Sequence, residues 1–288
     1  MPPSPATPPS RRVVVEPELV VTGGERIAAY RFGGDGPPLL LVHATGFHAH
    51  CWLPLLDHLR PCFSLFAFDL PGHGESSTPA DPARYHFTRM ADDLLAVLDH
   101  FGLPRVAALG HSVGGALVVR AELLRPGTVT RAVLFEPIIL PPEQQEETRA
   151  AEAARTRRMV FDSTADMIAR WSTRGPFATF DPAALEAYVE YGVRDRADGT
   201  VELKCSRPAE VATFMQDTTS GIWNDLERYA TPAMIYAGER STSRAAPLVE
   251  RIAARMRDAR AERLATFSHF LPFERPRAMA ERAIAFLT

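Results

Sequence analysis

Short runs of consecutive apolar residues alternate with longer stretches of helical periodicity along most of the chain. The apolar runs predict strands buried on both faces, at 39–42, 63–68, 106–109, 132–135 and 233–236. A more mixed strand pattern occupies 26–32, and another 262–267. Helical patterns occupy 90–101, 113–124, 247–256 and 276–287. This alternation predicts an α/β fold, a mostly parallel sheet with helices on both faces.

The alternation is interrupted once. Between about residue 141 and residue 223 no buried strand is evident, and the segment is rich in Ala, Arg and Glu, which favours helices. Helix breakers bound it, Pro137, Pro141 and Pro142 before it and Pro232 after it. We therefore expect a helical cap at 142–225, inserted into a core formed by 13–141 and 226–288. The proline-rich residues 1–12 are expected to form a disordered leader.

Composition narrows the classes of function. Of 288 residues, 46% are hydrophobic and 23% are charged, which is typical of a globular protein with a sizeable core. The net charge of −3 provides no basic surface, so we expect neither nucleic acid nor membrane as a partner. With no export signal or membrane-spanning stretch evident, we expect a cytoplasmic protein that binds a small molecule. A homo-oligomer is compatible with the sequence.

The strongest chemical feature follows the apolar run 106–109. Gly110-His111-Ser112-Val113-Gly114 has the pattern Gly-x-Ser-x-Gly, and a helical pattern begins at once. A sharp turn between strand and helix exposes a serine hydroxyl, and small residues on either side relieve crowding. The N–H of Val113, at the positive end of the helix, suits a developing oxyanion. These features predict that Ser112 is a nucleophile; the alternative is a glycine-rich turn with an idle serine.

With this motif, the chain resembles the α/β-hydrolase superfamily, over nearly its whole length after the leader. Asp69-Leu-Pro-Gly-His-Gly-Glu-Ser76 resembles the family's turn after the fourth strand, and Ser268-His269-Phe-Leu-Pro resembles its catalytic histidine loop. The resemblance implies an α/β-hydrolase fold in which Ser, acid and His follow in that order. His269 is the only histidine after Ser112, so we expect it to be the general base.

The loop after 39–42 resembles the family's oxyanion loop. It reads His43-Ala44-Thr45-Gly46-Phe47, with Ala44 where the family usually has glycine. The resemblance assigns the oxyanion hole to the backbone N–H groups of Thr45 and Val113. If the missing glycine served a positive φ, alanine would strain the loop, unless Gly46 supplies the freedom.

Histidines near this loop allow a second interpretation. His43, His48 and His50 could ligate a metal, but no carboxylate lies between His43 and Asp57. We therefore expect these histidines to line or brace the loop, and we expect no metal and no cofactor.

The third catalytic residue departs from the commonest pattern. The family's aspartate usually follows the strand after the cap, where this chain has Gly238-Glu-Arg-Ser241-Thr. Glu136, at the end of the 131–135 strand, stands where certain haloalkane dehalogenases carry their acid. We therefore expect Glu136 to orient His269, with Glu239 as the runner-up. The alternative is that Glu136 is a surface carboxylate that caps the first helix of the cap. Ser112 itself argues against dehalogenase chemistry, which needs a carboxylate nucleophile.

These residues predict a carboxylesterase that acts on small or medium apolar esters through an acyl-enzyme. The expected pocket, between core and cap, is lined by Phe47, Trp52, His111 and Trp171. The basic run from Arg155 to Arg158 could attract an anionic substrate, although a solvated helix face is favoured. The same residues could cleave C–C, lactone, thioester or amide bonds. A ligand-binding protein that has lost turnover is the non-enzymatic alternative.

Overall fold

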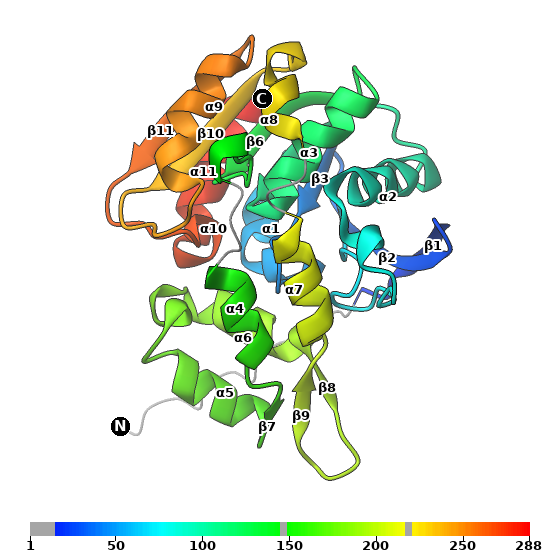
Figure 1. Cartoon of the computed structure of the whole chain (residues 1–288), viewed down its shortest axis with the longest axis vertical. Coiled ribbons are helices and arrows are strands. Elements are labelled where there is room, and N and C mark those ends of the chain that lie inside the picture. The colour runs from blue at the N-terminus through cyan, green and yellow to red at the C-terminus, as the bar shows by residue number, and fades with distance from the viewer. Residues whose placement is uncertain (1–14, 145–148, 217–220) are drawn as a thin grey trace, which may run out of the picture.

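An eight-stranded sheet forms the centre of the molecule (Figure 1). The computed structural model describes residues 15–144, 149–216 and 221–288, so the predicted leader at 1–12 lies outside the described residues. The strand order is β1-β2-β4-β3-β5-β6-β10-β11. Their bounds are β1 Glu18–Thr22, β2 Glu25–Gly33, β3 Pro38–Val42, β4 Ser64–Phe68, β5 Val106–His111, β6 Val129–Phe135, β10 Ala233–Gly238 and β11 Ala259–Leu264.

The sheet is mostly parallel, as the sequence predicts. β2 pairs antiparallel with both β1 and β4, and every other neighbouring pair is parallel. The strongly apolar central strands are buried on both faces, so helices must cover both sides. An apolar core on one face includes α2 Phe87–His100, α3 Val113–Leu124 and α9 Val249–Arg255; the other includes α1 Leu53–Leu59 and α11 Pro276–Leu287.

Most predicted elements lie within a few residues of the observed ones. The helix predicted at 113–124 and the one at 276–287 have the observed bounds. The last strand, β11, begins three residues before the predicted range of 262–267 and ends three residues before its end. Its burial pattern explains the shift, because an exposed or half-buried edge strand lacks the continuous apolar run of a central strand.

Most of the segment between β6 and β10 forms a layer below the sheet in Figure 1, whereas its last helix, α8, packs against α3 in the core. Its helices are α4 Arg149–Thr156, α5 Thr164–Trp171, α6 Pro182–Gly192, α7 Arg207–Met215 and α8 Ile222–Asp225. The segment is mostly helical, as expected, but three short strands that the sequence did not predict form a second, antiparallel sheet: β7 Val160–Phe161, β8 Val193–Asp195 and β9 Val201–Leu203. Asp198-Gly199, a typical hairpin turn pair, lies between β8 and β9 and could have revealed it. We refer to residues 142–225 as the cap.

None of the described helices combines the length and apolar character needed to cross a bilayer.

Candidate active site

Ser112 lies at the sharp turn between β5 and α3. Its backbone is strained, with φ 56° and ψ −118°, a conformation that side-chain-bearing residues adopt only where the surroundings enforce it. The Ser112 N–H donates a hydrogen bond to the carbonyl of Phe135, 2.9 Å away on the neighbouring strand. A Cβ on Gly114 would lie 2.2 Å from the carbonyl oxygen of Val42. The glycine after the serine is therefore required by close backbone approach.

His269 follows β11 and reaches back across the sheet to the end of β6. Its Nδ1 lies 2.6 Å from Oε2 of Glu136, a carboxylate that is completely buried. This contact fixes the ring's orientation and places a proton on Nδ1, so that Nε2 can act as a base. No hydrogen bond joins this ring to the Ser112 hydroxyl, a contact that in unliganded enzymes often tightens only with substrate.

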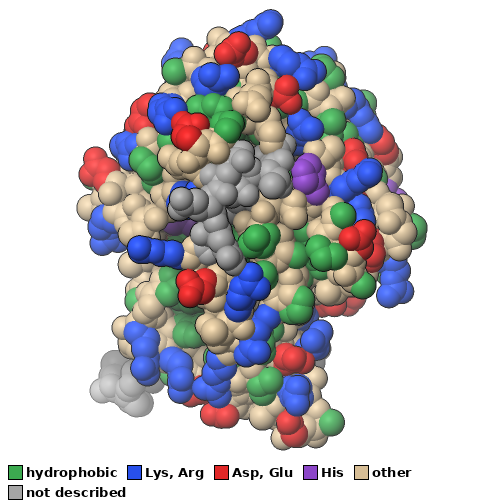
Figure 2. Space-filling model, viewed as in Figure 1, with side chains coloured by type: hydrophobic (Ala, Val, Ile, Leu, Met, Phe, Trp, Pro, Cys, Tyr) green, Lys and Arg blue, Asp and Glu red, His purple; other side chains and the backbone are tan. Residues whose placement is uncertain are grey.

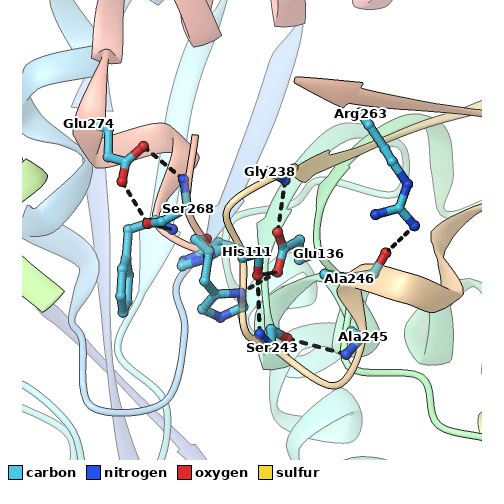
Figure 3. A network of polar contacts seen from close by, with 12 residues as sticks. His111, Glu136, Gly238, Ser243, Ala245, Ala246, Arg263, Ser268 and Glu274 are labelled. Carbon is cyan, nitrogen blue, oxygen red and sulfur yellow. Dashed lines mark hydrogen bonds and ion pairs between the residues drawn. The ribbon is translucent and has the colours of Figure 1, made fainter. Parts of the chain in front are cut away.

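Three groups converge on the Glu136 carboxylate. Its Oε1 accepts a hydrogen bond from the Gly238 N–H at 2.9 Å, and its Oε2 accepts one from the Ser241 hydroxyl at 2.7 Å, in addition to the His269 contact. Figure 3 shows the carboxylate facing the Gly238 nitrogen. Glu136 also adopts a positive φ of 43°, which turns the chain at the strand end. The runner-up, Glu239, is exposed.

The histidine loop passes close over the end of β10 because Gly238 has no side chain there. A Cβ on Gly238 would lie 2.3 Å from the Phe267 carbonyl oxygen and 2.4 Å from that of Ser268. Farther along, Glu274 accepts hydrogen bonds from both the backbone N–H and the hydroxyl of Ser268, at 3.1 and 2.6 Å (Figure 3). The loop that carries His269 is thus held at both ends.

Hydrogen bonds orient the peptide between Ala44 and Thr45. The Ala44 carbonyl accepts from His43 Nδ1–H at 2.8 Å and from the Phe47 N–H at 3.1 Å. Because the peptide is trans, the Thr45 N–H points the opposite way, and it has no acceptor within the described part of the chain. Ala44 has no positive φ, whereas Gly46 has a φ of 81°. The alanine therefore causes no strain, since the special conformation falls on Gly46.

Two neutral histidines support this loop. His43 Nε2 accepts a hydrogen bond from the Leu70 N–H, and His73 Nε2 accepts one from the Gly46 N–H, both at 2.9 Å. Burial lowers the pKa of His43 to about 4 and that of His73 to about 3. Among the residues described, no three His, Cys, Asp or Glu side chains are grouped as metal ligands would be. The turn at 69–76 thus supports the loop that carries Thr45.

Of the four predicted pocket residues, His111 lies beside His269, and Phe47 packs against His111. The His111 Nε2–H donates to the His269 carbonyl at 2.9 Å, and the two ring centroids are 4.8 Å apart. Burial holds the pKa of His111 well below its usual range, so the ring is neutral. Phe47 packs against His111, Phe270 and Phe273. Sequence reasoning missed Phe270 and Phe273, although they lie only one and four residues after His269.

The other two predicted pocket residues lie farther away. Trp52 is completely buried and packs against Phe273, so it supports the aromatic wall from within the core. Trp171 stacks on Phe177 inside the cap, with centroids 4.9 Å apart. Large size made both tryptophans candidates, but sequence gives no indication of which layer of a wall an aromatic residue occupies.

The arginines of the basic run in the cap do not share one environment. Arg155 and Arg158 are exposed, as expected of a solvated face, and Lys and Arg side chains are frequent over this part of the surface in Figure 2. Arg157 instead turns inward and forms a 2.7 Å ion pair with Glu210, whose side chain is 9% exposed. The solvated interpretation is therefore wrong for Arg157.

Comparisons with known proteins agree with this architecture. Residues 39–282 match the model of the alpha/beta hydrolase family. An uncharacterized protein of Mycobacterium tuberculosis is 36% identical over 107 residues, 37% of this chain but only 30% of that protein. The (E)-2-((N-methylformamido)methylene)succinate hydrolase of Acinetobacter baylyi is 25% identical over 213 residues, 68% of this chain and 78% of the relative.

A solved structure resembles the whole chain. The E-2-(acetamidomethylene)succinate hydrolase superimposes with a TM-score of 0.81, covering 95% of this chain and 99% of that one at 22% identity, a likeness that concerns the fold. The family match spans most of the chain and includes the strand ends that carry Ser112, Glu136 and His269. The chain belongs to the alpha/beta hydrolase family.

Proposed function

We propose that this protein is a serine hydrolase that cleaves carboxylic esters of small or medium size through an acyl-enzyme. Ser112 is the nucleophile, His269 the base and Glu136 the acid that orients it. The observation that carries the proposal is the 2.6 Å contact between His269 Nδ1 and the buried Glu136 carboxylate, beside a strained Ser112. Such an arrangement leaves Nε2 available for proton transfer.

The reaction would proceed in two halves. Ser112 Oγ bonds to the ester carbonyl carbon while His269 Nε2 takes its proton, and the N–H groups of Thr45 and Val113 bind the oxyanion. The C–O bond to the alcohol then breaks, and His269 returns the proton to the departing oxygen. Water, deprotonated by the same nitrogen, attacks the acyl carbon, releases the acid and restores Ser112.

The surroundings of His269 support an apolar substrate. Phe47 contacts Phe180 of the cap and Phe270 of the histidine loop, with centroid distances of 6.3 and 5.8 Å. A wall of aromatic rings favours hydrocarbon over charged groups. With a net charge of −3, the partner we propose is a small molecule and not nucleic acid or a membrane, in a cytoplasmic setting.

A second candidate is hydrolysis of a substituted methylenesuccinate. It is favoured by the match with the Acinetobacter baylyi hydrolase, which extends over 68% of this chain. Lactone, thioester and C–C cleavage would use the same three residues, so a substrate panel has to include each bond type.

A fluorophosphonate probe tests the proposal. It should label the wild-type protein and not Ser112→Ala, and p-nitrophenyl ester hydrolysis should fall by about 10⁶-fold in that variant. Ser172→Ala, which alters an exposed cap serine, is the matched control and should react like the wild type. A folded wild-type protein that neither labels nor hydrolyses any member of the panel would instead be a binding protein.

A further inference from the structure

A chain of buried and partly buried polar contacts runs from the cap to the loop that carries Thr45. The hydroxyl of Tyr188, on α6, donates a hydrogen bond to the Gly46 carbonyl at 3.0 Å. Arg157 Nη2–H donates to the same hydroxyl oxygen at 2.7 Å, and Arg157 Nη1–H donates to Oε1 of Glu210, on α7, at 2.7 Å. Side chains from three parts of the cap thus converge on one residue of the core.

That residue, Gly46, directly follows Thr45, whose N–H is a proposed oxyanion donor. Gly46 is held on both sides, because its N–H donates to His73 from the core while its carbonyl accepts from Tyr188 of the cap. A Cβ at this position would lie 2.8 Å from Glu210 Oε1, so the ion pair packs directly against the glycine. With both flanking peptides fixed, the direction of the Thr45 N–H is constrained from its C-terminal side.

Stability alone does not account for this ion pair. Removing two charges from water is so unfavourable that apolar residues of similar size are often equally stabilising in their place. What a buried charged pair provides is a defined geometry: the guanidinium is a planar donor that fixes the Tyr188 oxygen and strengthens the hydroxyl as a donor to Gly46. Burial raises the pKa of Tyr188 to about 12, so the hydroxyl keeps its proton at neutral pH.

We propose that Tyr188 is a positioning residue for the oxyanion hole and that Arg157 and Glu210 orient its hydroxyl, so that the cap sets the catalytic geometry of the core. This inference rests on the proposed function. It predicts that loss of the hydroxyl acts on the transition state more than on substrate binding, because Tyr188 acts through the Gly46 peptide.

The test compares Tyr188→Phe with Tyr191→Phe, the same chemical change on the same helix. For a p-nitrophenyl ester, Tyr188→Phe should lower kcat about 10-fold with KM within twofold, since displacement of a donor weakens it less than its removal does. Its inhibition by butylboronic acid, which places an oxygen in the oxyanion hole, should weaken by the same factor. Tyr191→Phe should retain wild-type values of both.

A charge-neutral double variant provides an independent readout. Arg157→Met/Glu210→Met removes both charges together and leaves the Tyr188 hydroxyl able to donate, so we expect a two- to fivefold fall in kcat, smaller than that of Tyr188→Phe. If the wild type is active and Tyr188→Phe retains its kcat and boronate affinity, the inference is wrong while the proposed function stands. A wild type that fails to hydrolyse esters or react with fluorophosphonate overturns both.

Discussion

The ends of two neighbouring strands, β6 and β10, have exchanged the roles that the family resemblance assigns them. The end of β10, where the resemblance places an aspartate, provides only hydrogen-bond donors, the Gly238 N–H and the Ser241 hydroxyl. The end of β6 provides the carboxylate, Glu136, which those donors hold against His269. One strand end thus carries the carboxylate that contacts His269, and the neighbouring strand end carries hydrogen-bond donors to that carboxylate.

The difference has a physical reason. The two ends lie side by side because β6 and β10 pair in parallel, with Phe135 opposite Tyr236. Glutamate is one methylene longer than aspartate, and the positive φ of Glu136 turns it at the strand end. A left-handed backbone is unfavourable for a residue with a Cβ. Its presence at Glu136 indicates that the surrounding contacts enforce this conformation.

Transfer of the acid from β6 to the end of β10 should have the largest effect on kcat. Glu136→Gly removes the carboxylate and suits the positive φ, so the protein should fold with kcat reduced by about 10⁴-fold. Adding Ser241→Asp should then recover about 10²-fold, because position 241 lies within hydrogen-bond distance of the Glu136 carboxylate. The measurement is kcat for a p-nitrophenyl ester in both variants. Equal rates in the two would show that the strand ends are not interchangeable.

Removal of the hydrogen bond from Ser241 to Glu136 should have an intermediate effect on kcat. Ser241→Ala deletes a hydrogen bond to the same oxygen that contacts His269, and we expect kcat to fall about 10-fold, the equivalent of one hydrogen bond to a charged group. Ser243→Ala, in the same loop, has no contact with Glu136 among the described residues and is the control. Equal activities for the two variants would mean that the Ser241 hydroxyl does not hold the acid.

We expect the smallest effect from the two buried histidines that have no carboxylate partner, and this effect is on stability. His43 and His73 are buried like Glu136 but have backbone partners only, and burial lowers their pKa to about 4 and about 3. In the unfolded chain they take up protons near pH 6.5, so the stability they contribute is complete above that pH and is lost as the pH falls toward 4.

Urea unfolding between pH 7 and pH 4.5 measures this loss. Below pH 6 the free energy of unfolding of His73→Gln should depend on pH less steeply than that of the wild type, by about 1.4 kcal/mol per pH unit. Glutamine retains an acceptor for the Gly46 N–H, and the raised pKa of buried Asp69 is common to both proteins. Parallel pH profiles would show that His73 is not held neutral.

Sequence predicts the parts of the site that depend on local pattern. The strand, turn and helix around Ser112 identify the nucleophile's position, and His269 is identified by being the only histidine downstream. Glu136 could be predicted because its place at a strand end is local too. The partnership of Arg157, Tyr188 and Glu210 could not be, since it joins segments 31 to 53 residues apart. Strands of two or three residues, such as β7, are too short for periodicity to reveal.

Glu136 is the residue that we propose as the acid of the catalytic centre. Its most direct test compares kcat/KM of Glu136→Gln and Glu239→Gln for a p-nitrophenyl ester, since both changes replace one carboxylate by its isosteric amide. We predict a loss of about 10⁴-fold for Glu136→Gln, with the fluorophosphonate site still present, and a value within twofold of wild type for Glu239→Gln. Full activity in Glu136→Gln together with loss in Glu239→Gln would show that Glu239, and not Glu136, is the acid.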